Sequence, residues 1–261
     1  MVMKKLFLYV LATVLSFAAV SCQNSNDESN QDIIDKGNKA PEISRMLDQI
    51  PDEDMDLHRN TVYNFLIKGG CDDFDNDIFC YSDHNISWVT SSDRNMRVYS
   101  SGCANFICYK HENSIVIDTC TIDGFEFIKT IDIVKSGDKK YYLLDMEFYV
   151  VHQGVIYGEE IYAFSIDGGK LKHEKLFRTA KKSYDRISVQ CGGQRWLPLN
   201  YNNTELIYYS KNYNAVYITE VNERDWPTGR GLKYEWNGQY FKYVGMCNYD
   251  ATSLDADYSS D

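Results

Sequence analysis

Three aspartates are the residues of this chain whose spacing comes nearest to a metal site: Asp73, Asp75 and Asp77, in the stretch CDDFDND. Side chains at alternate positions of a loop can converge on a hard cation such as Ca²⁺. The stretch does not fit an EF-hand, because Ile78 replaces the glycine of the sharp turn and His84 stands where a bidentate glutamate belongs. The two interpretations are a calcium loop of another type and, preferred here, a solvated acidic turn.

Indole rings are the second kind of candidate, because flat apolar rings with a polar edge suit the faces of sugars. Trp88, Trp196 and Trp226 could form such a ligand-binding surface. Packing between strands is the alternative use of aromatic residues in a sheet. Trp226 lies in a loop rich in Asp, Pro and Gly, so we expect its ring to be the most exposed of the three.

The sequence contains no local signature of catalysis: no HExxH, no G-x-S-x-G, no glycine-rich phosphate loop and no dinucleotide fingerprint. Four carboxylates of the central segment could include an acid–base pair such as glycosidases use; they are Asp145, Glu147, Glu159 and Glu160. Alternating charges on an exposed sheet face explain them more simply. We therefore predict no catalytic residue and no cofactor, and we favour a non-catalytic binding module over a glycan-active hydrolase.

The eight cysteines leave the disulfide pattern open. Spacing does not give connectivity, and buried thiols fit as well as bridges between near neighbours such as Cys103 and Cys108. No CxxC pair occurs, so neither a zinc knuckle nor a thioredoxin-like site is predicted.

These candidates lie on a chain that reads mostly as antiparallel β-structure. Apolar and polar residues alternate in short runs, and turn residues such as Asp167-Gly168-Gly169 and Asn237-Gly238 separate the runs. Asn-Gly predicts a two-residue type I′ hairpin. The predicted strands, which close as a propeller-like array or a sandwich, cover 78–82, 86–91, 96–101, 106–109, 115–119, 127–134, the central group in 139–177, 186–190, 206–210, 216–221, 231–236 and 239–244.

One N-terminal helix is predicted between Pro51 and the pair Gly69-Gly70. Acidic residues fill its first turn, where the helix dipole favours negative charge, and glycine favours its end. Its expected core-facing stripe consists of Met55, Val62, Phe65 and Leu66.

The first 22 residues resemble the precursor of a bacterial lipoprotein. Lys4 and Lys5 precede an apolar run over 6–20, which is shorter than a spanning helix. Ala19-Val20-Ser21-Cys22 is similar to a lipobox, with Ala19 where that family prefers Leu. The resemblance implies cleavage after Ser21 and acylation of Cys22. An ordinary signal peptide, with a plain thiol at Cys22, is the alternative.

Four segments follow from these patterns: a signal peptide over 1–21, a tether over 22–41 rich in Asn, Ser and acids, an antiparallel β domain with one helix over 42–247, and a disordered polar tail over 248–261. A single domain is preferred over two small ones. The phrases SSDRNMRVYSS, YAFSIDGGKLKHEKLF and TGRGLKYEWNGQYFKYVG resemble a group of secreted Bacteroidetes proteins across most of 85–246, and this resemblance implies no function.

Net charge limits the partners. The chain carries −11, and loss of residues 1–21 removes two lysines and leaves −13. Such a field repels phosphate backbones, so we expect no nucleic acid and no bilayer binding through a basic patch. Gln23 and Asn24 after the cysteine resemble lipoproteins of the outer membrane. The expected partners are that membrane, through a lipid anchor, and a glycan, a peptide or another envelope protein.

Overall fold

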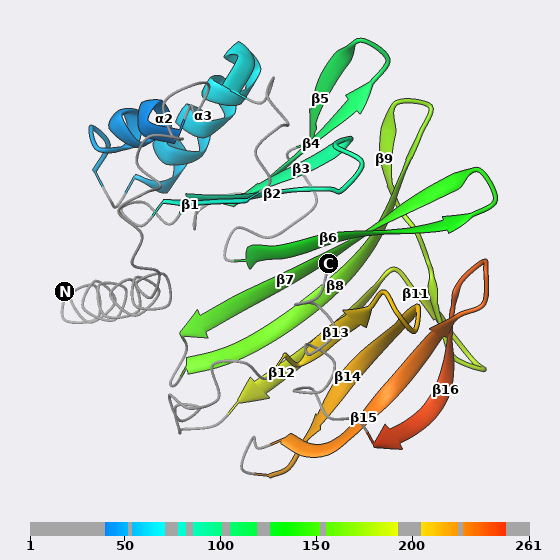
Figure 1. Cartoon of the computed structure of the whole chain (residues 1–261). Helices are drawn as coiled ribbons and strands as arrows, with labels where there is room; N and C mark the ends of the chain where they lie inside the picture. The colour runs from blue at the N-terminus through cyan, green and yellow to red at the C-terminus, as the bar shows by residue number, and fades with distance from the viewer. Residues whose placement is uncertain are drawn as a thin grey trace, which may run out of the picture. The chain divides into compact units, whose positions relative to one another are not determined.

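A computed structural model describes residues 40–51, 54–70, 78–81, 86–100, 105–118, 126–151, 155–192, 205–223 and 227–248. The chain is mostly β with antiparallel sheets and few helices, as the sequence predicts (Figure 1). It divides into two compact units, Met1–Phe127 and Ile128–Asp261, whereas the sequence prediction has one domain over 42–247. The physical basis of the division is that each unit has sheets and a buried cluster of its own. No described helix is long and apolar enough to cross a membrane.

The helical part of the first unit consists of α2 (Ala40–Leu47), α3 (Met55–Phe65) and a final turn η1 (Leu66–Gly70). Asp54 caps α3 by accepting a hydrogen bond from the Leu57 N–H at 3.0 Å, so the helix begins after the predicted start at Pro51. Gly69, with φ of 96°, ends it as predicted. The short helix α2 was not predicted, because it lies at the border of the polar segment assigned as a tether.

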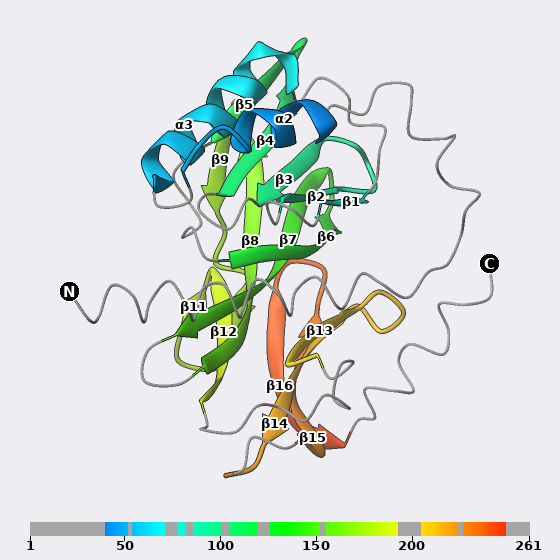
Figure 2. The ribbon, with the colours of Figure 1, turned by 90° about the vertical axis from the view of Figure 1, so that its left-hand side faces the viewer.

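Five strands of the first unit form one meander in which each strand pairs antiparallel with the next. They are β1 (Ile78–Tyr81), β2 (Ile86–Thr90), β3 (Met96–Ser100), β4 (Asn105–His111) and β5 (Ser114–Asp118). Figure 2 gives a second view of α2 and α3 beside this sheet. Val62, Phe65 and Leu66 are buried as expected, but Met55 is 40% exposed because it is the first residue of α3.

The second unit contains two sheets. The first has the order β12-β8-β7-β6, with β9 also paired to β8. Its strands are β6 (Glu126–Ser136), β7 (Lys139–Val151), β8 (Val155–Asp167), β9 (Lys170–His173) and β12 (Arg186–Gly192). The other has the order β11-β10-β16-β15-β14-β13. Its strands are β10 (Phe177–Arg178), β11 (Ser183–Tyr184), β13 (Ile207–Ser210), β14 (Ala215–Val221), β15 (Pro227–Trp236) and β16 (Phe241–Asn248).

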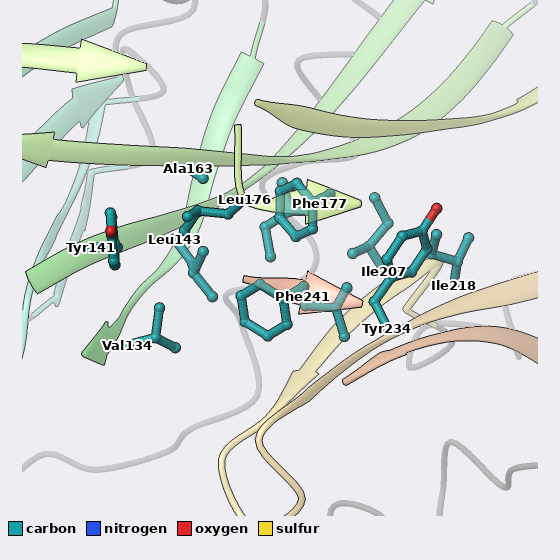
Figure 3. Close-up of a cluster of buried hydrophobic side chains, with 12 residues drawn as sticks. Val134, Tyr141, Leu143, Ala163, Leu176, Phe177, Ile207, Ile218, Tyr234 and Phe241 are labelled. Carbon is teal, nitrogen blue, oxygen red and sulfur yellow. The ribbon is translucent and has the colours of Figure 1, made fainter. Parts of the chain in front are cut away.

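Side chains of the two sheets meet in one apolar core (Figure 3). Leu143 of β7 and Ala163 of β8 are cross-strand partners in the first sheet, and both are at most 1% exposed. Phe177 and Phe241 represent the other sheet, with ring centroids 5.5 Å apart. The second unit is therefore held together by apolar contact between its sheets, as in a sandwich.

The turn at Asn237-Gly238 differs from the prediction. Trp236 pairs with Phe241, so four residues connect the strands in place of two. Gly238 alone has positive φ, at 93°, while the Asn237 side chain accepts hydrogen bonds from the Gln239 and Tyr240 N–H groups. The asparagine thus caps the turn through its side chain and is not a left-handed turn residue. The predicted hairpin between β8 and β9 is confirmed, with positive φ at both glycines of 168–169.

Candidate functional site

A lysine surrounded by three carboxylates is the most unusual polar group in the second unit. The ammonium nitrogen of Lys129 on β6 lies 3.5 Å from Asp145 Oδ2 on β7 and 3.3 Å from Glu159 Oε1 on β8. It also lies 3.5 Å from Glu205 Oε1, just before β13. Four segments therefore supply one cluster, defined here as the Lys129 cluster.

The period of two in a strand places the two central carboxylates on the core face. Asp145 follows Leu143 at the next position but one, and Leu143 belongs to the apolar core. Glu159 stands in the same relation to Ile161, which is the cross-strand partner of Asp145. Asp145 and Glu159 are thus diagonal neighbours on one face of the sheet.

Glu159 also connects the first sheet to an edge of the second. Its Oε2 accepts a hydrogen bond from the Ile207 N–H at 2.8 Å. Ile207 lies on β13, the last strand of the six-stranded sheet, and among the described strands it pairs only with β14. The backbone carbonyl of Glu205 is held in turn by the Thr219 hydroxyl at 2.7 Å. The carboxylate of Glu159 therefore satisfies an edge N–H that no described strand satisfies.

Burial controls the charges of the cluster. Asp145 is 7% exposed and Glu159 1%. Burial raises the pKa of Asp145 well above its usual value; the charge of Lys129 opposes this effect, and Glu159 and Glu205 add to it. Burial lowers the pKa of Lys129, but the attraction of the carboxylates outweighs it and leaves the pKa above normal. Asp145 Oδ1 is buried and receives no hydrogen bond from the described residues.

A second polar group involves the neighbouring residue of β8. Glu160 Oε2 accepts a hydrogen bond from the Tyr162 hydroxyl at 2.5 Å and one from Arg186 at 3.3 Å. The guanidinium of Arg186 lies over the Tyr162 ring, 5.8 Å from its centroid. The positive charge of Arg186 therefore compensates the negative charge of Glu160.

The expectation that the carboxylates of β7 and β8 lie on an exposed face is therefore wrong for Asp145, Glu159 and Glu160, all of which are buried. For the first two, the reason is that the core face of this sheet is covered by the second sheet of the same unit. Glu147 is only partly buried. The sequence does contain a signal, since a charged residue continues the apolar alternation Tyr141, Leu143 on β7.

Trp88 is the one predicted ligand-binding residue that the structure describes, and it is not an exposed platform. Its ring is 4% exposed and packs against Tyr99 at 5.0 Å between centroids, within the core under α2 and α3. Arg97 lies 5.8 Å from the ring centroid. The indole is therefore part of the packing of the first unit, the alternative use of aromatic residues in sheets.

The other predicted site residues lie outside the described residues: Cys22, Asp73, Asp75, Asp77, Trp196 and Trp226. Among the residues that the structure describes, no group of three or more His, Cys, Asp or Glu could hold a metal ion. Cys108 is a buried cysteine that forms no disulfide, and Cys247 forms none either. Cys103 lies outside the described residues.

Comparison with known proteins gives no further assignment. No family model matches the chain, and no curated protein and no solved structure matches it either.

Proposed function

We propose that this chain is a lipid-anchored protein of the bacterial outer membrane whose folded part is a non-catalytic binding module. The observation that carries the proposal is the N-terminal pattern of Lys4 and Lys5, an apolar run over 6–20, and Ser21-Cys22. Small residues before a cysteine at the end of such a run are what lipoprotein processing requires. With a mature charge of −13 and no basic patch predicted, attachment to an anionic surface depends on the acyl chains of Cys22.

The Lys129 cluster supports a structural role for the buried carboxylates. A catalytic pair needs one acid and one base facing a substrate. Here Lys129 lies between Asp145 and Glu159, and Glu159 is further engaged by the Ile207 N–H. Both carboxylates are nine-tenths buried or more. The arrangement therefore joins strands and leaves little access for a glycan.

The second half of β16 is the described surface that best suits a partner. Within β16, β10 pairs with Phe241 and Lys242 alone, so no described strand pairs with 243–248 on that side. Val244 and Met246 on this stretch are 47% and 41% exposed. An extended segment of another envelope protein fits such an edge as an added strand, with pockets for alternate side chains. We propose a protein partner on the strength of this edge; Trp88, the one described candidate for glycan stacking, is buried.

Labelling in cells tests the anchor. A palmitate analogue should label the wild-type chain and fail to label Cys22→Ala, which should also leave the outer-membrane fraction. Cys108→Ala is a matched control, because that thiol is buried in the folded part. Labelling that persists in Cys22→Ala would refute the anchor.

Site-specific photo-cross-linking tests the binding surface. A photoreactive residue at Met246 should give one defined adduct, whereas the same residue at Tyr213, which is 61% exposed on the turn between β13 and β14, should give none. Gly245 has φ of 121° beside a register shift, so it should not be replaced. Equal adducts at both positions, or none at either, would contradict the assignment.

The alternative function, a glycan hydrolase, rests on one observation: burial raises the pKa of Asp145, which lies next to Glu159. A carboxyl group whose pKa is raised by burial is suited to act as a general acid. Hydrolysis of a panel of chromogenic glycosides that is lost in Asp145→Asn, with folding retained, would replace the binding module by this function.

A further inference from the structure

We propose that Lys129 and Asp145 condense into an amide cross-link between β6 and β7, with Glu159 transferring the proton. This inference does not depend on lipid anchoring or on a partner. It assigns a chemical step to the Lys129 cluster, namely a single self-modification of the folded chain.

The three groups that this reaction needs are in contact. Lys129 supplies the amine, Asp145 the carboxyl group and Glu159 the base, with the amine nitrogen 3.5 Å from Asp145 Oδ2 and 3.3 Å from Glu159 Oε1. All three belong to neighbouring strands of one sheet, which fixes their distance. Well-oriented intramolecular partners react with effective molarities of about 10⁵ to 10⁸ M, so even a poorly activated amine can react over time.

Burial makes the separated charges of this pair costly. Ile161 is the cross-strand partner of Asp145, and Ile207 donates its N–H to Glu159; both isoleucines are at most 1% exposed. In such a medium an ammonium–carboxylate pair is costly, and transfer of one proton from Lys129 to Asp145 gives a neutral amine and a neutral acid. Burial raises the pKa of Asp145 in the direction of this transfer, whereas the surrounding carboxylates hold the pKa of Lys129 above normal and oppose it. The neutral pair is therefore a minor state, and the reaction is slow.

The step balances without an oxidant, a cofactor or a second substrate. The lone pair of the Lys129 nitrogen attacks Cγ of Asp145, and a C–N bond forms. Glu159 takes a proton from that nitrogen and passes it to the departing hydroxyl group of Asp145. The C–O bond breaks with its electron pair, water leaves, and Glu159 is again ionised.

An independent observation points to the same pair. Asp145 Oδ1 is buried without a hydrogen bond from the described residues, and a buried carboxylate oxygen left in this way is expensive. The amide removes the charge of Asp145 together with that of Lys129, and Oδ1 becomes an ordinary carbonyl oxygen. The cross-link thus removes the buried carboxylate oxygen that has no described hydrogen-bond donor.

A second lysine–aspartate pair provides an internal control. Lys211 lies closer to its partner, 2.9 Å from Asp132 Oδ1, but the Lys211 side chain is 57% exposed, against 19% for Lys129. An exposed ammonium is solvated by water, so condensation would not relieve a buried charge there. We expect no amide between Lys211 and Asp132. That result would show that a short distance between amine and carboxyl group is not sufficient for the reaction.

Peptide mass mapping of the full chain purified from whole cells tests the proposal. Digestion should yield a branched peptide joining the Lys129 and Asp145 segments, one water lighter than the two peptides together. Fragmentation must locate the bond, because cyclisation at Asp167-Gly168 also loses water but joins no second peptide. The branched species should be absent from Lys129→Arg and at least tenfold depleted in Glu159→Gln.

Asp145→Asn adds a signature that a structural role would not give. Attack on a carboxamide expels ammonia, so this variant should yield the same branched peptide as the wild type. Separate, unmodified peptides from folded wild-type chain after prolonged incubation would overturn the proposal, and this outcome requires no variant to fold. A water loss mapped to any other residue pair would overturn it equally.

Discussion

Gly158 provides a sharp test of the packing in the central sheet. It lies directly across from Phe148 in the pairing of β7 with β8, and the phenyl ring covers it. A Cβ added at Gly158 would lie 2.6 Å from Cε1 and 2.8 Å from Cε2 of that ring, closer than real contacts allow. Gly158 does not have positive φ, so Gly158→Ala introduces a steric overlap and no backbone strain.

The size of the effect follows from the room available to the ring. Phe148 is 6% exposed, so it cannot move into solvent without losing its contacts. Overpacking of this kind costs about 1 to 3 kcal/mol. Without the ring, Gly158→Ala should stabilise the fold instead of destabilising it. Alanine restricts the unfolded chain more than glycine and stabilises by about 0.4 to 1 kcal/mol where its conformation is allowed. Phe148→Val, which shortens the side chain to Cγ, provides that background.

Urea denaturation of four chains measures the coupling: wild type, each single variant and the double variant. We expect Gly158→Ala to lower the free energy of unfolding in the wild type and to leave it unchanged or raise it beside Phe148→Val. An equal loss in both backgrounds would refute the ring overlap. It would mean that the glycine is required for its backbone alone.

Three further predictions concern single positions. Gly238→Val should cost about 1 to 3 kcal/mol from its φ of 93° alone, since nothing lies within 4 Å of an added Cβ, and Gln239→Val should cost much less; equal losses would contradict this reason. In Glu159→Gln, where we expect the amide not to form, Asp145 remains a titratable carboxyl group whose pKa is higher in the folded than in the unfolded chain. The stability of this variant should be full below about pH 4 and should fall as the pH rises through the folded-state pKa of Asp145. Adding Asp145→Asn should abolish this pH dependence. Glu174 should show the opposite pH dependence: burial raises its pKa, but hydrogen bonds from Lys139 and Ser165 outweigh this effect and hold the pKa below normal. Its contribution of about 0.2 to 1 kcal/mol to the free energy of unfolding is therefore present above about pH 4 and lost as the pH falls further. A thermal melt of Glu174→Gln that matches the wild type at pH 7 would count against this prediction.

Strand positions were predictable because alternation and turn residues are local signals. The predicted strand at 186–190 corresponds to β12, and the runs around Gly168-Gly169 form the expected hairpin. The grouping into sheets was not predictable, since it depends on contacts between distant segments. The parallel pairing of Phe177 with Phe241 joins strands more than sixty residues apart and follows from core packing, not from any turn.

The conformation of the turn at Asn237-Gly238 could not be predicted from the local sequence either. Asn-Gly favours a two-residue hairpin in isolation. In the folded chain Trp236 packs on Phe241 at 4.9 Å and lies edge-on to Tyr141 at 6.0 Å, between centroids. These contacts fix where the strands end, and the turn adapts by using the Asn237 side chain as a cap.

The Lys129 cluster shows why burial of charge is difficult to infer from sequence. Exposed and buried acids occupy the same alternating positions in a strand, and only the second sheet decides between them. A buried ion pair seldom stabilises a fold relative to apolar residues, because desolvation offsets the attraction. Three carboxylates around one lysine make this cost larger, so the cluster requires a reason to persist.

An amide between Lys129 and Asp145 would supply that reason in energetic as well as chemical terms. It converts two buried charges into one neutral group, and Glu159 remains paired with the Ile207 N–H. A cross-link that closes a loop of this length also restricts the unfolded chain, by about 3 kcal/mol if the loop-entropy relation for disulfides applies. Lys129→Arg should therefore lower the free energy of unfolding more than Lys211→Arg, which keeps a pair between an exposed cation and the buried Asp132. A loss of the same size in both variants would argue that no bond forms.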